Sequence, residues 1–152
     1  MAQADGALEG VLDRLASQCA ASGGQLTSLR RLVLGLLLRA GQPVKAYTLI
    51  EEAAGQGRRL PPSSIYRVLD FLQEHGLVHK VNSLNSFVAC SESDGPQGHQ
   101  PLLLVCPRCQ KTAEVNDPDL SSMFFARLQA LGHHVQGGSI EVHGQCQFCA
   151  GK

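Results

Sequence analysis

The stretch LPPSSIYRVLDFLQEHG (residues 60–76) gives the clearest structural signal in the sequence. Pro61 and Pro62 favour an extended entry, Ser63 or Ser64 is expected to cap the helix that follows, and Gly76 is expected to end it. At about 100° per residue, the helix separates an apolar arc from a polar side. The arc comprises Ile65, Val68, Leu69 and Leu72, and the polar side comprises Ser63, Tyr66, Arg67, Asp70 and Glu74.

The segments on either side of this helix complete a winged helix-turn-helix. Upstream, the spacing of apolar residues predicts helices around residues 8–15, over LTSLRRLVLGLLLRAG (26–41) and over VKAYTLIEEAAG (44–55). The second helix should begin at Thr27, end at Gly41, and bury Leu29, Leu32, Val33 and Leu36. Downstream, LVHKV (77–81) and SFVAC (86–90) read as strands joined by the turn NSLN. Such a fold places the helix before the hairpin in the DNA major groove.

The second half of the chain predicts a smaller unit that contains three strands. SESDGPQGHQ (91–100) has no apolar residue, so we expect a hinge there. Beyond it, PLLLVC (101–106) and TAEV (112–115) read as strands, DPDLSSMFFARLQALG (117–132) as a helix and GSIEVHG (138–144) as a strand. The predicted fold class is α+β: a winged-helix domain over residues 1–90, a hinge over 91–100 and a β-β-α-β unit over 101–152.

Composition and charge narrow the class of protein further. At 43% hydrophobic residues with no Trp, the chain can bury a mostly aliphatic core. The longest apolar run, LVLGLLL (32–38), is too short for a bilayer, and charges interrupt the first 20 residues, so we expect a cytoplasmic protein without a membrane span. Residues 14–90 carry nine Lys or Arg against four Asp or Glu, whereas residues 91–152 carry four against six. The basic half suits a polyanion, although solvated surface charge gives the same count.

Two CxxC pairs, CPRC (106–109) and CQFC (146–149), provide four thiols. Cys106, Cys109, Cys146 and Cys149 are the ligand complement of a closed tetrahedral zinc site. The two pairs are further apart than in most zinc ribbons, but the intervening strand, helix and strand can bring them together. The alternative is a redox dithiol, which needs a CxxC that opens a helix after a buried strand. We expect neither pair to do so, and therefore favour a structural metal.

A second set of metal-binding side chains is scattered through the middle of the sequence. His79 lies in the first hairpin strand, Cys90 at the end of the second, His99 in the hinge and Glu114 beyond the first CxxC pair. Together they would offer one sulfur, two nitrogens and one oxygen, a set that favours zinc over iron or manganese. Each also has an ordinary explanation, because a free cysteine is usually a small buried residue and the others suit a solvated surface. Their spacing alone leaves both interpretations open.

Taken together, these motifs resemble the ferric uptake regulator family, and within it the zinc uptake regulators. The resemblance runs from about residue 26 to residue 149. It rests on LTSLRRLVL (26–34), PPSSIYRVLDFLQEHGLVHKV (61–81), NSFVAC (85–90), CPRCQKTAEV (106–115) and IEVHGQCQFC (140–149).

The resemblance implies a homodimer in which each chain has a winged-helix DNA-binding domain and a dimerisation domain. It implies two zinc ions per chain, one structural and one regulatory. The structural ion would lie on Cys106, Cys109, Cys146 and Cys149, and the regulatory ion on His79, Cys90, His99 and Glu114. It also implies a zinc-responsive repressor of zinc-uptake genes that binds a palindromic operator in double-stranded DNA. In this scheme zinc fixes the angle between the domains, and so selects the geometry that fits DNA.

Positions that the family directs at DNA are also present. Tyr47 and Arg67 match residues that contact bases, and Arg30 resembles a residue that contacts phosphate. Further candidates on the same predicted helix as Arg67 are Ser63, Ser64 and Tyr66. Additional cations that we expect to neutralise phosphate, or simply to be solvated, are Arg31, Lys45, Arg58 and Arg59.

The sequence departs from many relatives in having only His99 where they carry a histidine-rich run. We therefore expect no third metal site, and expect His133, His134 and His143 to be surface or core residues, with His143 as a weak candidate ligand.

Other functions remain to be weighed against this one. A zinc hydrolase needs an open coordination position, which four protein ligands do not leave, and no nucleophile motif is present, so we expect neither an enzyme nor a small-molecule substrate. A constitutive winged-helix factor with only structural zinc, and an iron or peroxide sensor of the same family, are the remaining alternatives.

Overall fold

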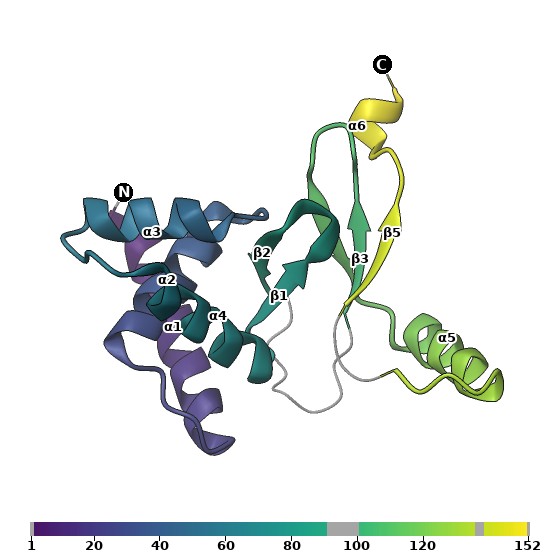
Figure 1. Ribbon diagram of the computed structural model, residues 1–152, viewed down its shortest axis with the longest axis horizontal. Coiled ribbons are helices and arrows are strands. Elements are labelled where there is room, and N and C mark those ends of the chain that lie inside the picture. Colours follow the sequence, from purple (N-terminus) through teal and green to yellow (C-terminus); the bar gives the residue numbers. More distant parts are fainter. Residues whose placement is uncertain (1, 91–100, 136–138, 152) are drawn as a thin grey trace. The chain divides into compact units, whose positions relative to one another are not determined.

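The computed structural model describes residues 2–90, 101–135 and 139–151. The chain divides into two compact units, Met1–His99 and Gln100–Lys152 (Figure 1). The hinge expected over residues 91–100 lies outside the described residues, so that assignment and the domain limits stay predictions. Among the described residues, none of the helices is both long enough and apolar enough to span a membrane.

The first unit contains four helices and a β-hairpin (Figure 1). The helices are α1 (Ala2–Ala21), α2 (Ser28–Ala40), α3 (Ala46–Gly55) and α4 (Pro62–Glu74). The hairpin consists of β1 (Val78–Val81) and β2 (Ser86–Ala89), which pair antiparallel around the short 3-10 helix η1 (Asn82–Leu84). This order of elements confirms the predicted winged helix-turn-helix.

Local sequence signals set the ends of α2 and α4. The Thr27 side chain accepts a hydrogen bond from the backbone N–H of Arg30, and Gly41 ends α2 in the left-handed region with φ of 62°. The predicted cap of α4 by Ser63 or Ser64 was wrong. The helix begins at Pro62 with no side-chain cap, because proline has no N–H to satisfy and its φ is already helical.

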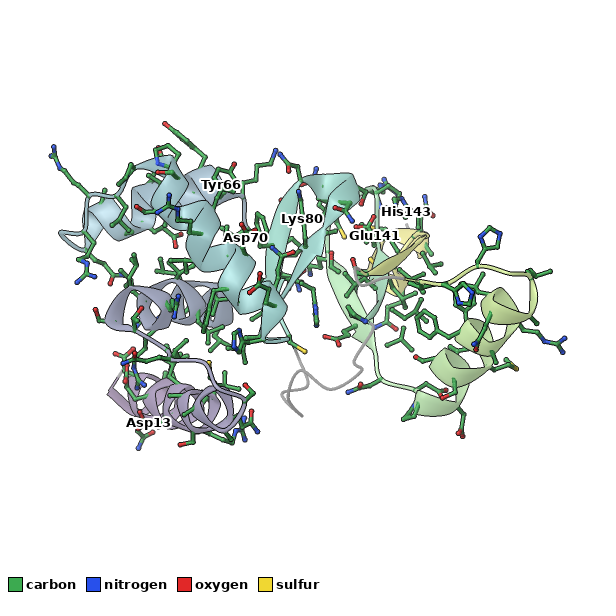
Figure 2. All side chains as sticks on the ribbon, turned by 60° about the horizontal axis from the view of Figure 1, so that its bottom comes forward. Asp13, Tyr66, Asp70, Lys80, Glu141 and His143 are labelled. Atoms are coloured by element: carbon green, nitrogen blue, oxygen red, sulfur yellow. The ribbon has the colours of Figure 1, made fainter. Side chains whose placement is uncertain are left out.

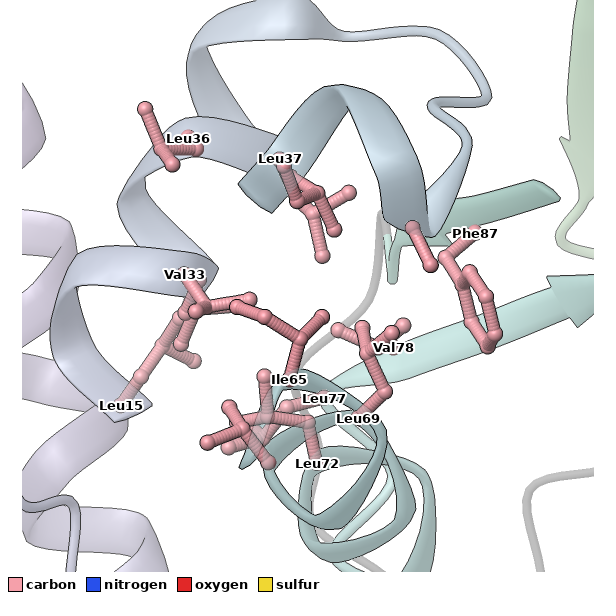
Figure 3. Close-up of a cluster of buried hydrophobic side chains, with 14 of the residues drawn as sticks. Leu15, Val33, Leu36, Leu37, Ile65, Leu69, Leu72, Leu77, Val78 and Phe87 are labelled. Atoms are coloured by element: carbon pink, nitrogen blue, oxygen red, sulfur yellow. The ribbon is translucent and has the colours of Figure 1, made fainter. Parts of the chain in front are cut away.

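Aliphatic side chains from every helix of the first unit form one continuous core (Figure 3). The predicted arc of α4 is confirmed: Ile65, Val68, Leu69 and Leu72 are all buried. The single buried stripe expected on α2 was too narrow, because α2 contacts α1, α3, α4 and β2. Burial therefore extends around α2 to a second face, whose fully buried residues are Leu34 and Leu37, while Leu29 and Leu32 are only partly buried.

The second unit contains a three-stranded sheet and two helices. Its elements are β3 (Leu102–Val105), β4 (Thr112–Val115), α5 (Pro118–Ala130), β5 (Ile140–His143) and α6 (Gln147–Ala150). The strand order is β4-β3-β5, with β3 antiparallel to β4 and parallel to β5. A parallel pair needs a crossover connection, which α5 provides. The β-β-α-β prediction is confirmed, whereas α6 was not predicted.

Little of the second unit is buried within a single chain. Among its described residues only Pro101, Leu103, Val105 and Cys106 are buried, and no residue of α5 is. Leu104 and Val142 are paired positions on one face of the sheet, and both are exposed. The unit therefore leaves an apolar sheet face and an uncovered helix available for other contacts.

Candidate metal centre and nucleic-acid interface

The two CxxC pairs meet at one end of the sheet of the second unit. Cys106 directly follows β3, and Cys146 caps α6 shortly after β5. Because β3 and β5 are adjacent and parallel, their carboxyl ends lie side by side, and the two pairs lie with them. The sulfur atoms of all four cysteines are within 4.8 Å of one another. The strand pairing thus explains how two motifs far apart in sequence form one cluster.

The dimensions of the cluster fit a tetrahedral zinc ion. Four thiolates at a Zn–S distance of ~2.3 Å would be separated from one another by ~3.8 Å. The Cys109 and Cys146 sulfurs are 3.7 Å apart. The first pair is held in a tight turn by two backbone hydrogen bonds, from Cys106 N–H to the Lys111 carbonyl and from Gln110 N–H to the Cys106 carbonyl. The four cysteines can therefore hold zinc.

The backbone of the cluster already favours negative charge. Backbone N–H groups of Cys109 and Cys146 lower the pKa of Cys106 to about 6. The backbone N–H of Cys149 likewise lowers the pKa of Cys146. In contrast, a hydrogen bond to Cys146, together with burial, raises the pKa of Cys149 to about 12. These opposite shifts describe thiols that share protons, and a bound divalent cation is what would let all four ionise together.

One reason for rejecting a redox dithiol was wrong. Cys146 and Cys149 do open a helix after a strand, because α6 begins directly after Cys146. However, α6 has only four residues, and both sulfurs lie among those of the other pair. The convergence of four sulfur atoms, and not the lack of a helix, is what favours a metal over a dithiol.

The second set of candidate ligands is distributed over both units. His79 pairs with Val88 across the hairpin, so Cys90, two residues beyond Val88, is on the same face. The sulfur of Cys90 and a ring nitrogen of His79 are within 4.8 Å of each other, and His79 is only 7% exposed. Glu114 lies on β4, opposite Leu103, and is partly buried. His99 lies outside the described residues.

Two tyrosines are exposed on neighbouring helices of the first unit. Tyr47 on α3 is 70% exposed and Tyr66 on α4 is 51% exposed. Tyr66 and Asp70 are one turn apart on α4 and both are exposed (Figure 2). Ser63 and Arg67 are exposed on the same helix. Exposed aromatic side chains beside polar ones are typical of a recognition surface, because they add nothing to the hydrophobic core.

Three candidate DNA contacts border one shallow depression of about 240 Å³: Arg30, Ser64 and Arg67. It lies between the start of α2 and the first two turns of α4. The Arg30 guanidinium donates a hydrogen bond of 2.7 Å to the Gln25 carbonyl and lies 3.5 Å above the Phe71 ring. Arg30 is thus oriented before any ligand arrives.

Arg31 was expected to neutralise phosphate or to be solvated, and in the structure it forms ion pairs within the first unit. Its guanidinium contacts Glu9 at 2.5 Å and Asp13 at 2.8 Å, both on α1. Arg39, two turns further along α2, is 3.5 Å from Asp5. The signal that was missed is the placing of these three carboxylates at four-residue intervals, which puts them on one face of α1.

Known proteins are similar to this chain in sequence and in fold. The amino-acid sequence matches the Ferric uptake regulator family model over residues 21–143. The chain belongs to the ferric uptake regulator family. It is 33% identical over 131 residues to the zinc uptake regulation protein of Escherichia coli (strain K12). This match covers 86% of this chain and 76% of that protein.

Two solved structures resemble this family member over both units. The crystal structure of holo XcZur superposes with a TM-score of 0.82 at 38% sequence identity. The superposition covers 94% of this chain and 99% of the XcZur chain. A zinc uptake regulator complexed with zinc and DNA gives a TM-score of 0.83 at 30% identity, and covers 95% of both chains.

The three histidines nearest the end of this ferric uptake regulator family member lie at the surface. His133 and His134 are exposed just after α5. His143 on β5 is also exposed, and its Nε2 is 3.4 Å from a carboxylate oxygen of Glu141 (Figure 2). None of the three belongs to a group of three or more converging metal-binding side chains within the described ranges.

Proposed function

We propose that this protein is a zinc-responsive, DNA-binding transcriptional repressor of zinc-uptake genes. The observation that carries the proposal is its similarity, over 95% of the chain, to a zinc uptake regulator complexed with zinc and DNA. The relative from Escherichia coli, a zinc uptake regulation protein, supports the same function. DNA is the proposed partner, so we place the protein in the cytoplasm, and we propose no catalytic activity and no small-molecule substrate for it.

In this proposal α4 is the recognition helix. The exposed guanidinium of Arg67 suits a bidentate contact with guanine, and Tyr47 is free to contact bases from α3. The depression beside Arg30 suits a backbone phosphate, because the Arg30 side chain and the Ser64 side chain border one small space. Ser63 and Tyr66 are the flanking contacts. The operator would be palindromic, since two copies of α4 related by a dimer axis read equivalent half-sites.

Two zinc ions per chain complete the proposal. Cys106, Cys109, Cys146 and Cys149 would hold a structural ion, and His79, Cys90, His99 and Glu114 a regulatory one. The shared face of His79 and Cys90 on the hairpin supports the second set. When bound, zinc supplies a cross-link between segments that are distant in the sequence. Ligation of the second set would restrict the relative movement of the two units, and so the spacing of the recognition helices on DNA.

The second unit supports the proposed homodimer. Leu104 and Val142 leave one face of the sheet apolar and exposed. On α5, Leu120, Met123 and Phe124 are also exposed. Large exposed apolar patches of this kind mark sites of interaction with other surfaces. A second copy of the chain would cover both surfaces and supply the core that one copy lacks.

Selection of DNA duplexes from a random pool tests the function directly. The purified protein would be offered the pool at buffered high free zinc and at very low free zinc. We expect a palindromic site that is recovered only at high zinc. Recovery of the same site under both conditions would reduce the protein to a constitutive DNA-binding factor, and recovery under iron alone would make it an iron sensor.

Two variants separate regulation from folding in the same assay. Cys90→Ser should abolish the zinc dependence of DNA binding and leave the zinc of the four-cysteine cluster in place. His133→Gln, which changes an exposed histidine outside both sets, is the control and should behave as wild type. A zinc response that survives Cys90→Ser would contradict the regulatory assignment.

A further inference from the structure

Cys19 and His75 belong to neither proposed zinc site, yet their side chains meet beside Gly24. Cys19 lies near the end of α1 and His75 directly follows α4. A methyl group added to Gly24 would lie 2.4 Å from Nε2 of His75 and 2.8 Å from the sulfur of Cys19. Both distances are too short for a real side chain. The sulfur and the ring nitrogen therefore face the same small space, which a glycine keeps open.

The orientation of His75 is that of a metal-binding histidine. Its Nδ1 lies 3.0 Å from the Phe71 carbonyl oxygen, which can only accept a hydrogen bond, so Nδ1 carries the proton. In the tautomer that this bond selects, Nε2 keeps its lone pair, and Nε2 is the ring atom nearest to the space beside Gly24 that the Cys19 sulfur also borders. The Phe71 ring, at 4.1 Å between centroids, holds the imidazole in this position. Histidine ligands in metal sites are commonly fixed by such a bond from the other ring nitrogen.

The surroundings of Cys19 favour a monovalent cation over a divalent one. Cys19 is only 2% exposed, and this burial raises the pKa of its thiol, with Arg30 acting in the opposite direction. A thiolate bound to a monovalent cation is neutral and can remain buried, whereas a divalent cation would leave a net positive charge near Arg30. Among the described residues, no third His, Cys, Asp or Glu joins this pair. Zinc, which takes four ligands, is therefore disfavoured.

We propose that Cys19 and His75 bind one Cu(I) ion in the first unit, independently of the zinc ions of the proposed function. Cu(I) is soft, prefers thiolate ligands and accepts imidazole, and a single sulfur and a single nitrogen suffice for linear coordination. Binding breaks the S–H bond of Cys19, forms a Cu–S bond and releases one proton to solvent. No electron is transferred, because the ion enters as Cu(I).

A competition titration tests the site in the full-length, zinc-loaded protein. Cu(I) would be supplied without oxygen as its coloured bicinchoninate complex, and zinc release would be followed in the same samples with a chromogenic indicator. We expect the wild type to remove one equivalent of Cu(I) before any zinc is released. Cys19→Ser and His75→Gln should each retain Cu(I) at least tenfold more weakly. X-ray absorption of the one-equivalent complex should show one sulfur and one nitrogen neighbour.

Controls separate this site from the four-cysteine cluster, which also attracts Cu(I). His133→Gln should match the wild type, whereas Gly24→Ala, which keeps both donor atoms but fills the space, should lose the uptake. Unfolding curves of all variants identify any variant that does not fold. If Cys19→Ser does not fold, His75→Gln still tests the site, because His75 lies at a partly exposed helix end. Equal uptake by wild type and both ligand variants, or uptake only with stoichiometric zinc release, would overturn the proposal.

Discussion

The two units of this protein are stabilised in different ways. In the first unit, four helices and a hairpin bury one aliphatic core, in which residues such as Leu34 and Leu69 are completely inaccessible. The second unit buries only four of its described residues, and two of them, Val105 and Cys106, lie at its cysteine cluster. Hydrophobic burial within one chain thus accounts for the first unit, whereas the second unit depends on the proposed zinc ion and the proposed partner surface for its stability.

Cys106→Ser is expected to have the largest effect and to separate the two units most directly. If zinc in the cluster holds the second unit together, its removal should cost on the order of 10 kcal/mol of folding free energy, and that unit should unfold while the first remains folded. Amide spectra by NMR together with zinc content would show this. Cys90→Ser makes the same chemical change elsewhere and should leave the second unit folded. A fully folded Cys106→Ser second unit would mean that zinc is dispensable there.

Acidification should also release the proposed zinc and unfold the second unit, and this change should be reversible. The folded pKa of Cys106, about 6, is below its ordinary value of 9.0, so its thiolate stabilises the folded state at high pH, and this contribution is lost as the pH falls through about 6. Protons compete with zinc for the same sulfur atoms, so zinc release on acidification should have its midpoint on the acid side of neutrality. Zinc release against pH, read with an indicator dye, measures this midpoint. Release near neutral pH would exclude the four-cysteine cluster as the holder of that zinc.

In the first unit, Leu69→Ala should show the cost of hydrophobic burial. Leu69 is fully buried between α4 and its neighbours, so truncation should lower the free energy of unfolding by about 2–5 kcal/mol and leave the zinc of the second unit bound. Urea unfolding, followed alongside zinc content, would separate the two units. Asp70→Ala, the exposed neighbour, should change stability by less than about 0.5 kcal/mol. Loss of zinc in Leu69→Ala would show that the units are not independent.

A smaller effect is expected at the exposed sheet face of the second unit. Val142→Asp would place a charge at the proposed dimer interface, and should raise the dimer dissociation constant by about 10- to 100-fold, or about 1.4–2.7 kcal/mol. Analytical ultracentrifugation measures this constant. Gln145→Asp, at an exposed polar position, is the matched control. An unchanged constant for Val142→Asp would place the interface elsewhere.

The smallest expected effect is at the start of α2. Thr27→Ala removes the side chain that caps this helix, and should cost about 1 kcal/mol in the first unit only. Thr27→Ser keeps the hydroxyl and should recover most of the loss. Thermal unfolding of the two variants beside the wild type gives the difference. Equal stability of all three would show that the first turn of α2 is held by tertiary packing instead.

What could be predicted from sequence depended on the range of the interactions. Thr27 and Gly41 act on their own helix, so the limits of α2 could be predicted. The burial of Leu34 could not, because it depends on helices that cover α2 from several directions. Likewise, the four cysteines could be identified as a set from their spacing. The ion pairs of Arg31 could not be predicted, because their carboxylates are on α1 and the sequence does not show that α1 packs beside α2.

The parallel pairing of β3 with β5 also sets an order of events during synthesis. Leu102–Val105 cannot gain this neighbour until Ile140–His143 has been made, and the second CxxC pair follows later still. At roughly 5–20 residues per second, the ribosome needs a few seconds to cover this distance. During that interval the first unit is already complete and able to fold. The sulfur cluster can therefore close only after almost all of the chain has been made, and the proposed zinc ion would bind at that late step.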